Sequence, residues 1–457
     1  MARISRPTVL KLLAGAFMVG LLSVAGGAPV LAQQFDANAY KALVDADSAE
    51  TVPEGTVITA HNWQKYRNFF GIGEQALYSG KYEFHVGDTP DFDVVVGPKT
   101  SFRQPAKLTQ DTEKYSTQTR LEPTAGGSYT IKNWVAGWPF PNPQEPQRAY
   151  KVYFDGWGSY IPEAYFFKSA SPNGDRYYNH YSTWVDLANY RLTHRSDPGV
   201  SVDFPENQGV LLTQYIFVTA PEQSKYTVSL TLQYDDPNKL NDVYVFLPSL
   251  RRSLRLSSAA RCSPILGSDY LNDDNTNGLS LVVSNFRMEY LGEKKILAIV
   301  NGKAGGDATR DLADSTMTQH APLGAWPVVK NLSPWEVRKV HVIRITPIPE
   351  LAGRAYCYSN QVIYLDAEFY LPLTRETYDV GGKLWKVQIV PYFPTKIYDG
   401  FMPLNSYSSD GCIIDLQNLH YSTASLYEKS YGLNNIPKKY QDISIKAFPK
   451  GLAQVMQ

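Results

Sequence analysis

The sequence predicts a mainly β (α+β) fold built on a large twisted antiparallel sheet with a few helices. Three observations support this prediction. The chain of 457 residues contains 32 Gly and 30 Pro, so turns interrupt it often. Aromatic residues make up 13% and charged residues 19% of the chain, which is too apolar for a disordered protein. From about residue 200 onward, apolar and polar residues alternate with the period of two that is typical of strands.

The N-terminal segment, residues 1–32, has the organisation of a secretory signal peptide. Three cations and no acid are followed by a mostly apolar stretch, and small residues precede a cleavage point after Ala32. An uncleaved membrane anchor is the alternative, because the apolar stretch is nearly long enough to span a bilayer. We expect cleavage and export, which leaves residues 33–457 as one large soluble domain.

The helical signal lies mainly between residues 33 and 200. Asp36 is placed to cap a short helix, and Thr59 is placed to cap a second one that Gly71 would end. A third helix is predicted from about residue 107 to 118. We therefore expect a helix-rich portion over about 33–200.

The strand-rich portion covers about residues 200–457. Its clearest strands are predicted at 226–234, 243–247, 340–345, 362–369 and 384–390. Short turns separate neighbouring strands, so antiparallel pairing is expected. The first of these strands alternates regularly, which predicts one buried face and one face in water. No repeat of 20–50 residues is visible, which argues against a propeller or a solenoid.

Charge and cysteine content exclude several classes of protein. The 44 Lys and Arg residues balance 44 Asp and Glu residues, so the chain lacks the basic excess of a nucleic-acid-binding protein. The three cysteines, Cys262, Cys357 and Cys412, permit at most one internal disulfide, and three unpaired thiols are equally compatible with the sequence. None of them forms a C-x-x-C pair, which argues against a redox or zinc role.

No motif for catalysis, metal binding or cofactor binding is present. The seven histidines are scattered, and the acidic pairs Asp235-Asp236 and Asp273-Asp274 have the composition of solvated turns. The segment that starts at Asp273 fits the first half of a calcium loop, but Ser284 occupies the position of the essential Glu. An ordinary turn is therefore favoured there, and we predict no catalytic residue, no metal and no cofactor.

Four arginines lie close together in this nearly neutral chain: Arg251, Arg252, Arg255 and Arg261. They could hold an anionic head group or the acidic patch of a partner protein. The alternative is a solvated edge whose cations pair with nearby carboxylates at Asp269, Asp273 and Asp274.

The stretch from Tyr244 to Asp274 resembles the motif of a domain-of-unknown-function family of Gram-negative periplasmic proteins, often labelled outer-membrane lipoprotein-sorting proteins. The matching elements are Phe246-Leu247-Pro248, Leu250-Arg251-Arg252, Gly267-Ser268-Asp269 and Asp273-Asp274. Segments near residues 53–59, 77–82, 135–141 and 378–385 are also similar, so the resemblance extends over most of the mature chain.

The resemblance implies a LolA/LolB-like fold, which is an open β half-barrel with an apolar concave face and a few covering helices. It implies a periplasmic location and defines no catalytic residue. It also implies partners, namely a resistance-nodulation-division exporter and an outer-membrane protein. Two features depart from the family: Cys262, and a length far greater than that of a minimal carrier.

We predict a soluble periplasmic carrier or accessory protein that binds a hydrophobic or lipidic molecule during envelope transport. Burying a C16 acyl chain is favourable by roughly 13 kcal/mol before ordering costs, so no catalytic group is needed. The candidate ligand-binding residues are Tyr226, Val228, Leu230, Phe246, Leu250, Arg251, Arg252 and Trp385. The two arginines would lie at the mouth of the site, and the alternative for each apolar residue is a place in an ordinary core.

Two further functions remain open at this point. The first is an envelope hydrolase whose carboxylates and histidines are brought together by folding, which a cleft with two facing carboxylates would support. The second is a non-catalytic partner that docks on an exporter complex through its arginines.

Overall fold

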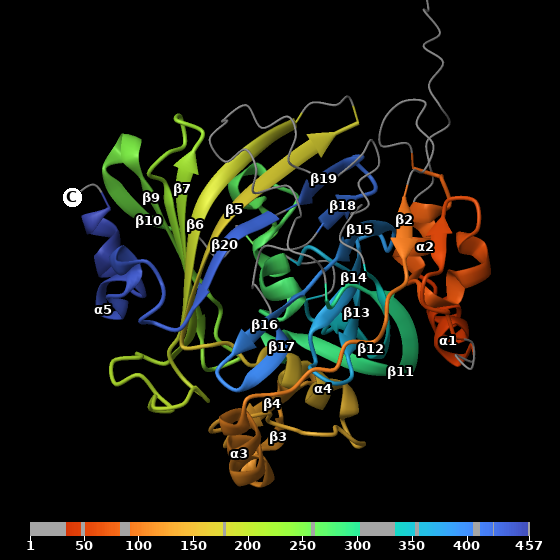
Figure 1. Ribbon diagram of the computed structural model, residues 1–457, viewed down its shortest axis with the longest axis horizontal. Helices are drawn as coiled ribbons and strands as arrows, with labels where there is room; N and C mark the ends of the chain where they lie inside the picture. The colour runs from red at the N-terminus through yellow and green to blue at the C-terminus, as the bar shows by residue number, and fades with distance from the viewer. Residues whose placement is uncertain are drawn as a thin grey trace, which may run out of the picture. The chain divides into compact units, whose positions relative to one another are not determined.

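An open antiparallel sheet of fourteen strands organises the chain (Figure 1). The computed structural model describes residues 33–46, 51–82, 92–176, 180–256, 261–301, 334–351, 356–404, 412–423 and 425–455. The predicted signal peptide lies outside the described residues. Within these ranges, no helix is both long enough and apolar enough to cross a bilayer.

The strands of the large sheet follow the chain in two runs. They are β5 (Ala164–Asp175), β6 (His180–Arg191), β7 (Val210–Ala220), β8 (Val228–Tyr234), β9 (Asp242–Leu247), β10 (Arg252–Arg255), β11 (Phe286–Ala298), β12 (Glu336–Pro347), β13 (Asn360–Asp366), β14 (Pro372–Tyr378), β15 (Leu384–Ile389), β18 (Cys412–Asp415), β19 (His420–Thr423) and β20 (Ser425–Tyr431). Their order is β10-β9-β8-β7-β6-β5-β19-β18-β15-β14-β13-β12-β11, and β20 pairs with β5 beside β19. One run consists of β5 to β10, and the other consists of β11 to β15 with β18 and β19. The two runs meet where β5 pairs with β19, and β10 and β11 are the edge strands of the sheet.

The remaining elements are short. The helices are α1 (Ala37–Asp45), α2 (Ile72–Tyr78), α3 (Ala106–Tyr115), α4 (Arg148–Trp157) and α5 (Ile443–Lys446). Small two-stranded sheets pair β1 (Val57–Thr59) with β2 (Asp93–Val95), β3 (Arg120–Pro123) with β4 (Tyr129–Lys132), and β16 (Phe393–Ile397) with β17 (Gly400–Leu404). The 3₁₀ helices are η1 (Trp63–Phe69), η2 (Ser116–Gln118), η3 (Ala125–Gly127), η4 (Pro248–Leu250), η6 (Ile265–Gly267), η7 (Asn272–Gly278), η8 (Val283–Asn285), η10 (Lys438–Tyr440) and η11 (Pro449–Gln454).

The predicted fold class is confirmed: the chain is mainly β, with one large open antiparallel sheet and a few helices. The predicted strands at 226–234, 243–247, 340–345, 362–369 and 384–390 correspond to β8, β9, β12, β13 and β15. Within the described residues, neighbouring strands of this sheet pair antiparallel, as the short turns predict.

Two of the three predicted helices are confirmed, since Asp36 caps α1 and α3 covers most of the third prediction. The prediction that starts at Thr59 is wrong in its boundaries. The segment is the 3₁₀ helix η1, and Gly71 begins α2 instead of ending a helix. The cause is Glu74, whose carboxyl oxygen accepts a hydrogen bond from Gly71 N at 3.0 Å and fixes the helix start there.

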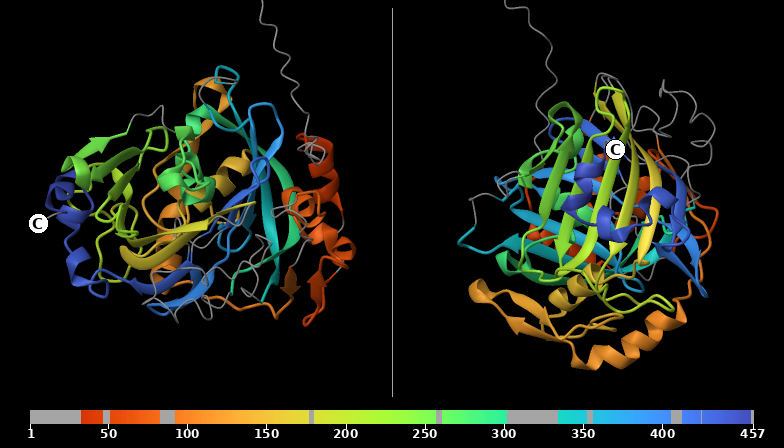
Figure 2. Two further views of the ribbon diagram at one scale, coloured as in Figure 1. Left: turned by 90° about the horizontal axis from the view of Figure 1, so that it is seen from above. Right: turned by 90° about the vertical axis from the view of Figure 1, so that its left-hand side faces the viewer.

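The outer face of each half of the sheet is covered by one end of the chain (Figure 2). Residues of α1, η1 and α2 share one hydrophobic core with the outer face of β11–β15. A C-terminal segment, residues 436–452, shares another core with the outer face of β5–β9. Both ends of the described chain therefore stabilise the sheet by burying its convex side.

Two segments of the chain, helix α4 and residues 261–285, lie against the inner face of the sheet. Helix α4 packs with Leu279, Leu281 and Val283 against inner-facing residues of β5, β12 and β13. A central segment, residues 261–285, contains η6, η7 and η8 and lies between the two halves of the sheet (Figures 1 and 2). The prediction that β8 has one face in water is wrong, because residues on both of its faces are buried.

Two carboxyl groups are buried where α2 meets the outer face of β14. Glu376 Oε1 accepts a hydrogen bond from Gly73 N at 2.8 Å, and its other oxygen accepts one from the Tyr40 hydroxyl. Burial raises the pKa of Glu74 to about 8 and that of Glu376 to about 7. Burial lowers the pKa of the nearby Lys294 to about 8, so this ammonium stays protonated below pH 7.

This arrangement predicts a stability that falls as pH rises from about 5 to 7. In that range the folded protein keeps protons on Glu74 and Glu376 that the unfolded chain, with carboxyl pKa values near 4.5, has released. We expect Glu376→Gln to reduce the fall in Tm between pH 5 and 7 by at least about 2 °C. Thermal unfolding at several pH values tests this, with the exposed Glu113→Gln as the matched control. An unchanged pH dependence in Glu376→Gln would contradict the assignment.

Candidate functional site

A buried ion pair anchors the central segment to the inner face of the sheet. Arg375 Nη1 of β14 lies 2.5 Å from Asp274 Oδ1 of η7, and both side chains have no exposed surface. Tyr358 donates a hydrogen bond to the same carboxylate at 2.8 Å. Burial opposes ionisation, but the Arg375 and Lys386 cations hold the pKa of Asp274 below its ordinary value. The centre of the inner face is therefore polar and filled.

A second set of contacts reinforces this anchor. Arg261 Nη2 lies 2.5 Å from Asp273 Oδ1, and a disulfide joins Cys262 to Cys357, just before β13. Cys412 is free and buried. The sequence allowed either one internal disulfide or three unpaired thiols, and the structure shows one disulfide. The predicted solvated turn at Asp273-Asp274 is wrong. Both carboxylates are buried and form the ion pairs described above, and the two residues belong to the 3₁₀ helix η7.

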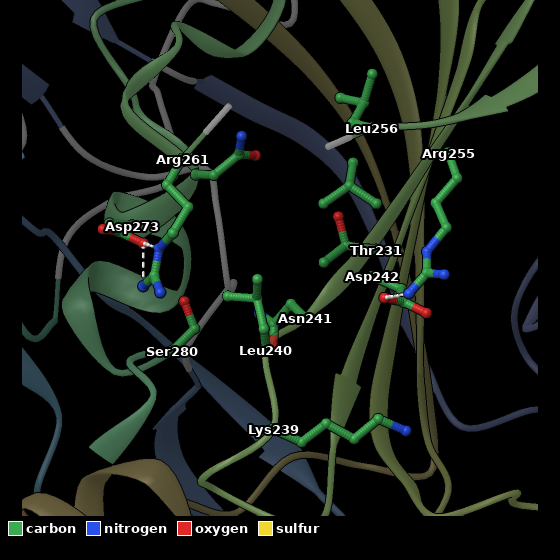
Figure 3. A pocket seen from close by; sticks show the side chains of 12 residues that line it. Thr231, Lys239, Leu240, Asn241, Asp242, Arg255, Leu256, Arg261, Asp273 and Ser280 are labelled. Carbon is green, nitrogen blue, oxygen red and sulfur yellow. Dashed lines mark hydrogen bonds and ion pairs between the residues drawn. The ribbon is translucent and has the colours of Figure 1, made fainter. Parts of the chain in front are cut away.

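A cavity of about 620 Å³ separates the central segment from the end of the sheet formed by β8, β9 and β10 (Figure 3). Thr231, Val243 and Leu256 belong to its sheet wall, while Asp273 and Ser280 belong to the wall of the central segment. This volume lies within the range of roughly 300–1,000 Å³ that small-molecule sites occupy.

The sheet wall of the cavity continues as an apolar stripe on the inner face of β9 and β10. The register pairs Leu254 with Val245 and Arg252 with Leu247, and Leu256 N donates a hydrogen bond to Val243 O at 2.8 Å. Alternation along each strand therefore places five apolar side chains on one face. They are Val243, Val245, Leu247, Leu254 and Leu256, none of which is fully buried.

The arginines of the cluster have different environments. Arg255 and Asp242 form an ion pair at 2.5 Å, and both residues also line the cavity (Figure 3). Arg261 is neutralised by Asp273. Arg251 and Arg252 are exposed at the turn between β9 and β10, and in the described part of the chain neither makes an ion pair. Among the described residues, the predicted pairing with the carboxylates at 269, 273 and 274 is found for Arg261 alone. Arg251, Arg252 and Arg255 are exposed at the edge strand β10 or the turn before it.

The predicted ligand-binding residues lie in four different places. Val228, Leu230 and Phe246 are at most 4% exposed and pack against the C-terminal segment on the outer face. Tyr226 is exposed just before β8, and Trp385 packs against Tyr358 beside the central segment. Leu250, Arg251 and Arg252 lie at the turn that ends the apolar stripe. A ligand-binding role for the eight residues stays a prediction.

Sequence reasoning missed the stripe for an identifiable reason. The arginines at 251, 252 and 255 give the run from Arg251 to Leu256 the composition of a basic cluster, although Leu254 and Leu256 alternate with Ser253 and Arg255 as in a strand. In β9, apolar residues occupy both faces, so alternation could not show which one faces inward.

One group of His, Asp and Ser side chains bears on the hydrolase alternative. His420 Nδ1 lies 2.6 Å from Asp269 Oδ2, and Ser422 Oγ donates to the same oxygen at 2.8 Å. The serine therefore points at the carboxylate and not at the imidazole that would have to deprotonate it. The hydrogen bond to Asp269 also raises the pKa of His420, which favours the protonated ring. Among the described residues, no cluster of His, Cys, Asp and Glu is placed to hold a metal ion.

Residues 57–448, well over half of the chain, match the family described as "Protein of unknown function (DUF1329)". The chain belongs to the DUF1329 family. The family resemblance predicted from the Tyr244–Asp274 stretch is thereby confirmed. No curated protein matches this DUF1329 chain.

Several solved structures are similar to this DUF1329 protein. One is a domain from Vibrio parahaemolyticus described as an outer membrane lipoprotein-sorting protein domain, with TM-score 0.43, 12% identity, and coverage of 66% of this chain and 99% of that one. Another is a DUF1329 family protein from Desulfovibrio piger, with TM-score 0.42, 13% identity, and coverage of 66% and 98%. A third is a LolA superfamily protein from Nitrosomonas europaea, with TM-score 0.36, 12% identity, and coverage of 64% and 96%.

The anchor of the central segment gives a stability prediction. Arg375→Met removes the partner of a fully buried carboxylate, so we expect it to lower the free energy of unfolding by about 3–5 kcal/mol. The same substitution in the exposed pair of Arg120 and Glu122 should cost no more than about 1 kcal/mol. Urea denaturation of the two variants measures both values. Equal effects would show that the buried pair does not hold the segment in place.

Proposed function

We propose that this DUF1329 protein is a soluble periplasmic carrier or accessory protein, and that it binds the apolar part of a hydrophobic or lipidic molecule at the cavity beside β9 and β10. The observation that carries the proposal is the apolar stripe. Five apolar side chains line the inner face of β9 and β10, at one end of the sheet, and are left partly uncovered beside a cavity of about 620 Å³.

The stripe differs from the rest of the sheet in what covers it. Elsewhere, the outer faces are buried by the two ends of the chain, and the inner face is filled by α4 and the central segment. An alkyl chain laid along the stripe would complete this burial at roughly 0.8 kcal/mol per methylene group. No bond needs to be made or broken for such a role.

The wider role follows from the sequence. The predicted signal peptide supports export to the periplasm, and the confirmed family supports a place among proteins of the Gram-negative envelope. The exporter and outer-membrane partners implied by the family resemblance stay a prediction. The hydrolase alternative has less support, because the Ser422 hydroxyl is directed away from His420.

The proposal predicts that a charge in the stripe abolishes binding. Leu254→Asp places a carboxylate beside Val245, where it would lose its hydration when an alkyl chain binds. We expect this variant to bind a fluorescent fatty-acid analogue at least about tenfold more weakly than the wild type, measured by fluorescence titration. Val380→Asp, in an exposed turn between β14 and β15, is the matched control and should bind normally.

Ligand carried from the cell provides an independent measurement. We expect native mass spectrometry and solvent extraction of gently purified protein to reveal an apolar molecule. Protein that carries no such molecule in repeated preparations, and that binds no fluorescent lipid, would refute the carrier function.

A further inference from the structure

We infer that the molecule bound at the stripe is an amphiphile with an alkyl chain and an anionic head group, and that its head lies at Arg252 and Arg251. This inference rests on the proposed function and adds the ligand's charge and orientation. It depends on where the uncompensated cations are located relative to the apolar side chains.

The position of Arg252 is set by strand register. Arg252 pairs with Leu247, and Leu254 pairs with Val245, so alternation places Arg252 on the same face as the stripe. Arg252 therefore ends the stripe on the side of the β9–β10 turn, while Leu256 and Val243 end it at the cavity. The separation between Arg252 and Leu256 is four residue steps, or ~13 Å along the strand.

The charges at the two ends of the stripe differ. At the cavity end, Asp273 neutralises Arg261 and Asp242 neutralises Arg255. One further cation lines the cavity, Lys239, and its ammonium lies 3.3 Å from the centroid of the Tyr234 ring. Figure 3 shows the pair of Arg261 and Asp273 on the wall opposite Leu256. At the turn, Arg251 and Arg252 are exposed, and the described residues place no carboxylate in an ion pair with either of them. An anionic head is therefore favoured at the turn, and the alkyl chain is directed toward the cavity.

The exposed Leu250 supports this orientation. It is 49% exposed in η4, directly before the two arginines, and adds apolar surface beside them. A cationic or zwitterionic head would gain less, because each would bring positive charge close to Arg251 and Arg252.

The test compares ligands that share one chain length and differ in head charge. Isothermal titration calorimetry would measure the binding of dodecanoate, dodecanol and dodecyltrimethylammonium to the mature wild-type protein. We expect dodecanoate to bind about tenfold more tightly than dodecanol, and the cationic amphiphile to bind most weakly. The preference for dodecanoate should decrease at high salt, because the arginines are exposed.

The variants locate the head group. The double substitution Arg251→Gln and Arg252→Gln should equalise the affinities for dodecanoate and dodecanol while leaving dodecanol binding unchanged. Arg67→Gln, an exposed arginine in η1 that packs near β11, should keep the preference. Circular dichroism and Tm of each variant confirm that it is folded.

Different outcomes separate the two proposals. Equal binding of dodecanoate and dodecanol by the wild type, or a preference that survives the double substitution, would overturn the inference and leave the carrier function standing. No binding of any of the three amphiphiles would refute the carrier function itself. Acetate should not compete with dodecanoate, and competition at equal concentration would show a site for small anions, which would also overturn the inference.

Discussion

The buried contact between Arg375 and Asp274 determines what the inner face of this sheet can do. A guanidinium and a carboxylate without exposed surface meet at 2.5 Å, and Tyr358 and Lys386 add further polar contacts. Such a pair is costly to separate, because either charge left alone in the interior would lose its hydration without compensation. The central segment is therefore held against the middle of the sheet, and the Cys262–Cys357 disulfide holds it a second time.

This anchor explains why the candidate site is at the end of the sheet and not at its centre. An apolar concave face would allow a ligand to lie across the middle strands, as the family resemblance implied. Here the middle carries Arg375, Lys386 and Gln388, which contact the central segment instead. The stripe on β9 and β10 extends beyond that segment, so its apolar side chains remain partly uncovered and border the cavity.

Local signals predicted many elements correctly. Asp36 caps α1 because its carboxylate accepts a hydrogen bond from a free backbone N–H, a purely local interaction. Alternation predicted β8, but not that both of its faces are buried, because burial depends on residues far away in the sequence, such as positions 436–452 on the outer face. The assignment of Val228, Leu230 and Phe246 to a ligand site depended on the same missing information, since the C-terminal segment packs on them.

The sequence by itself determined the class of this protein: a turn-rich antiparallel sheet, a predicted export signal, and a family resemblance that begins in the stretch from Tyr244 to Asp274. These features depend on composition, period and short motifs, which act over a few neighbouring residues. Only the tertiary structure decided which cysteines pair, which arginines are neutralised and which apolar face stays uncovered. Each of those outcomes depends on contacts between residues tens to hundreds of positions apart, and the alternation along one strand does not specify its neighbours across the fold.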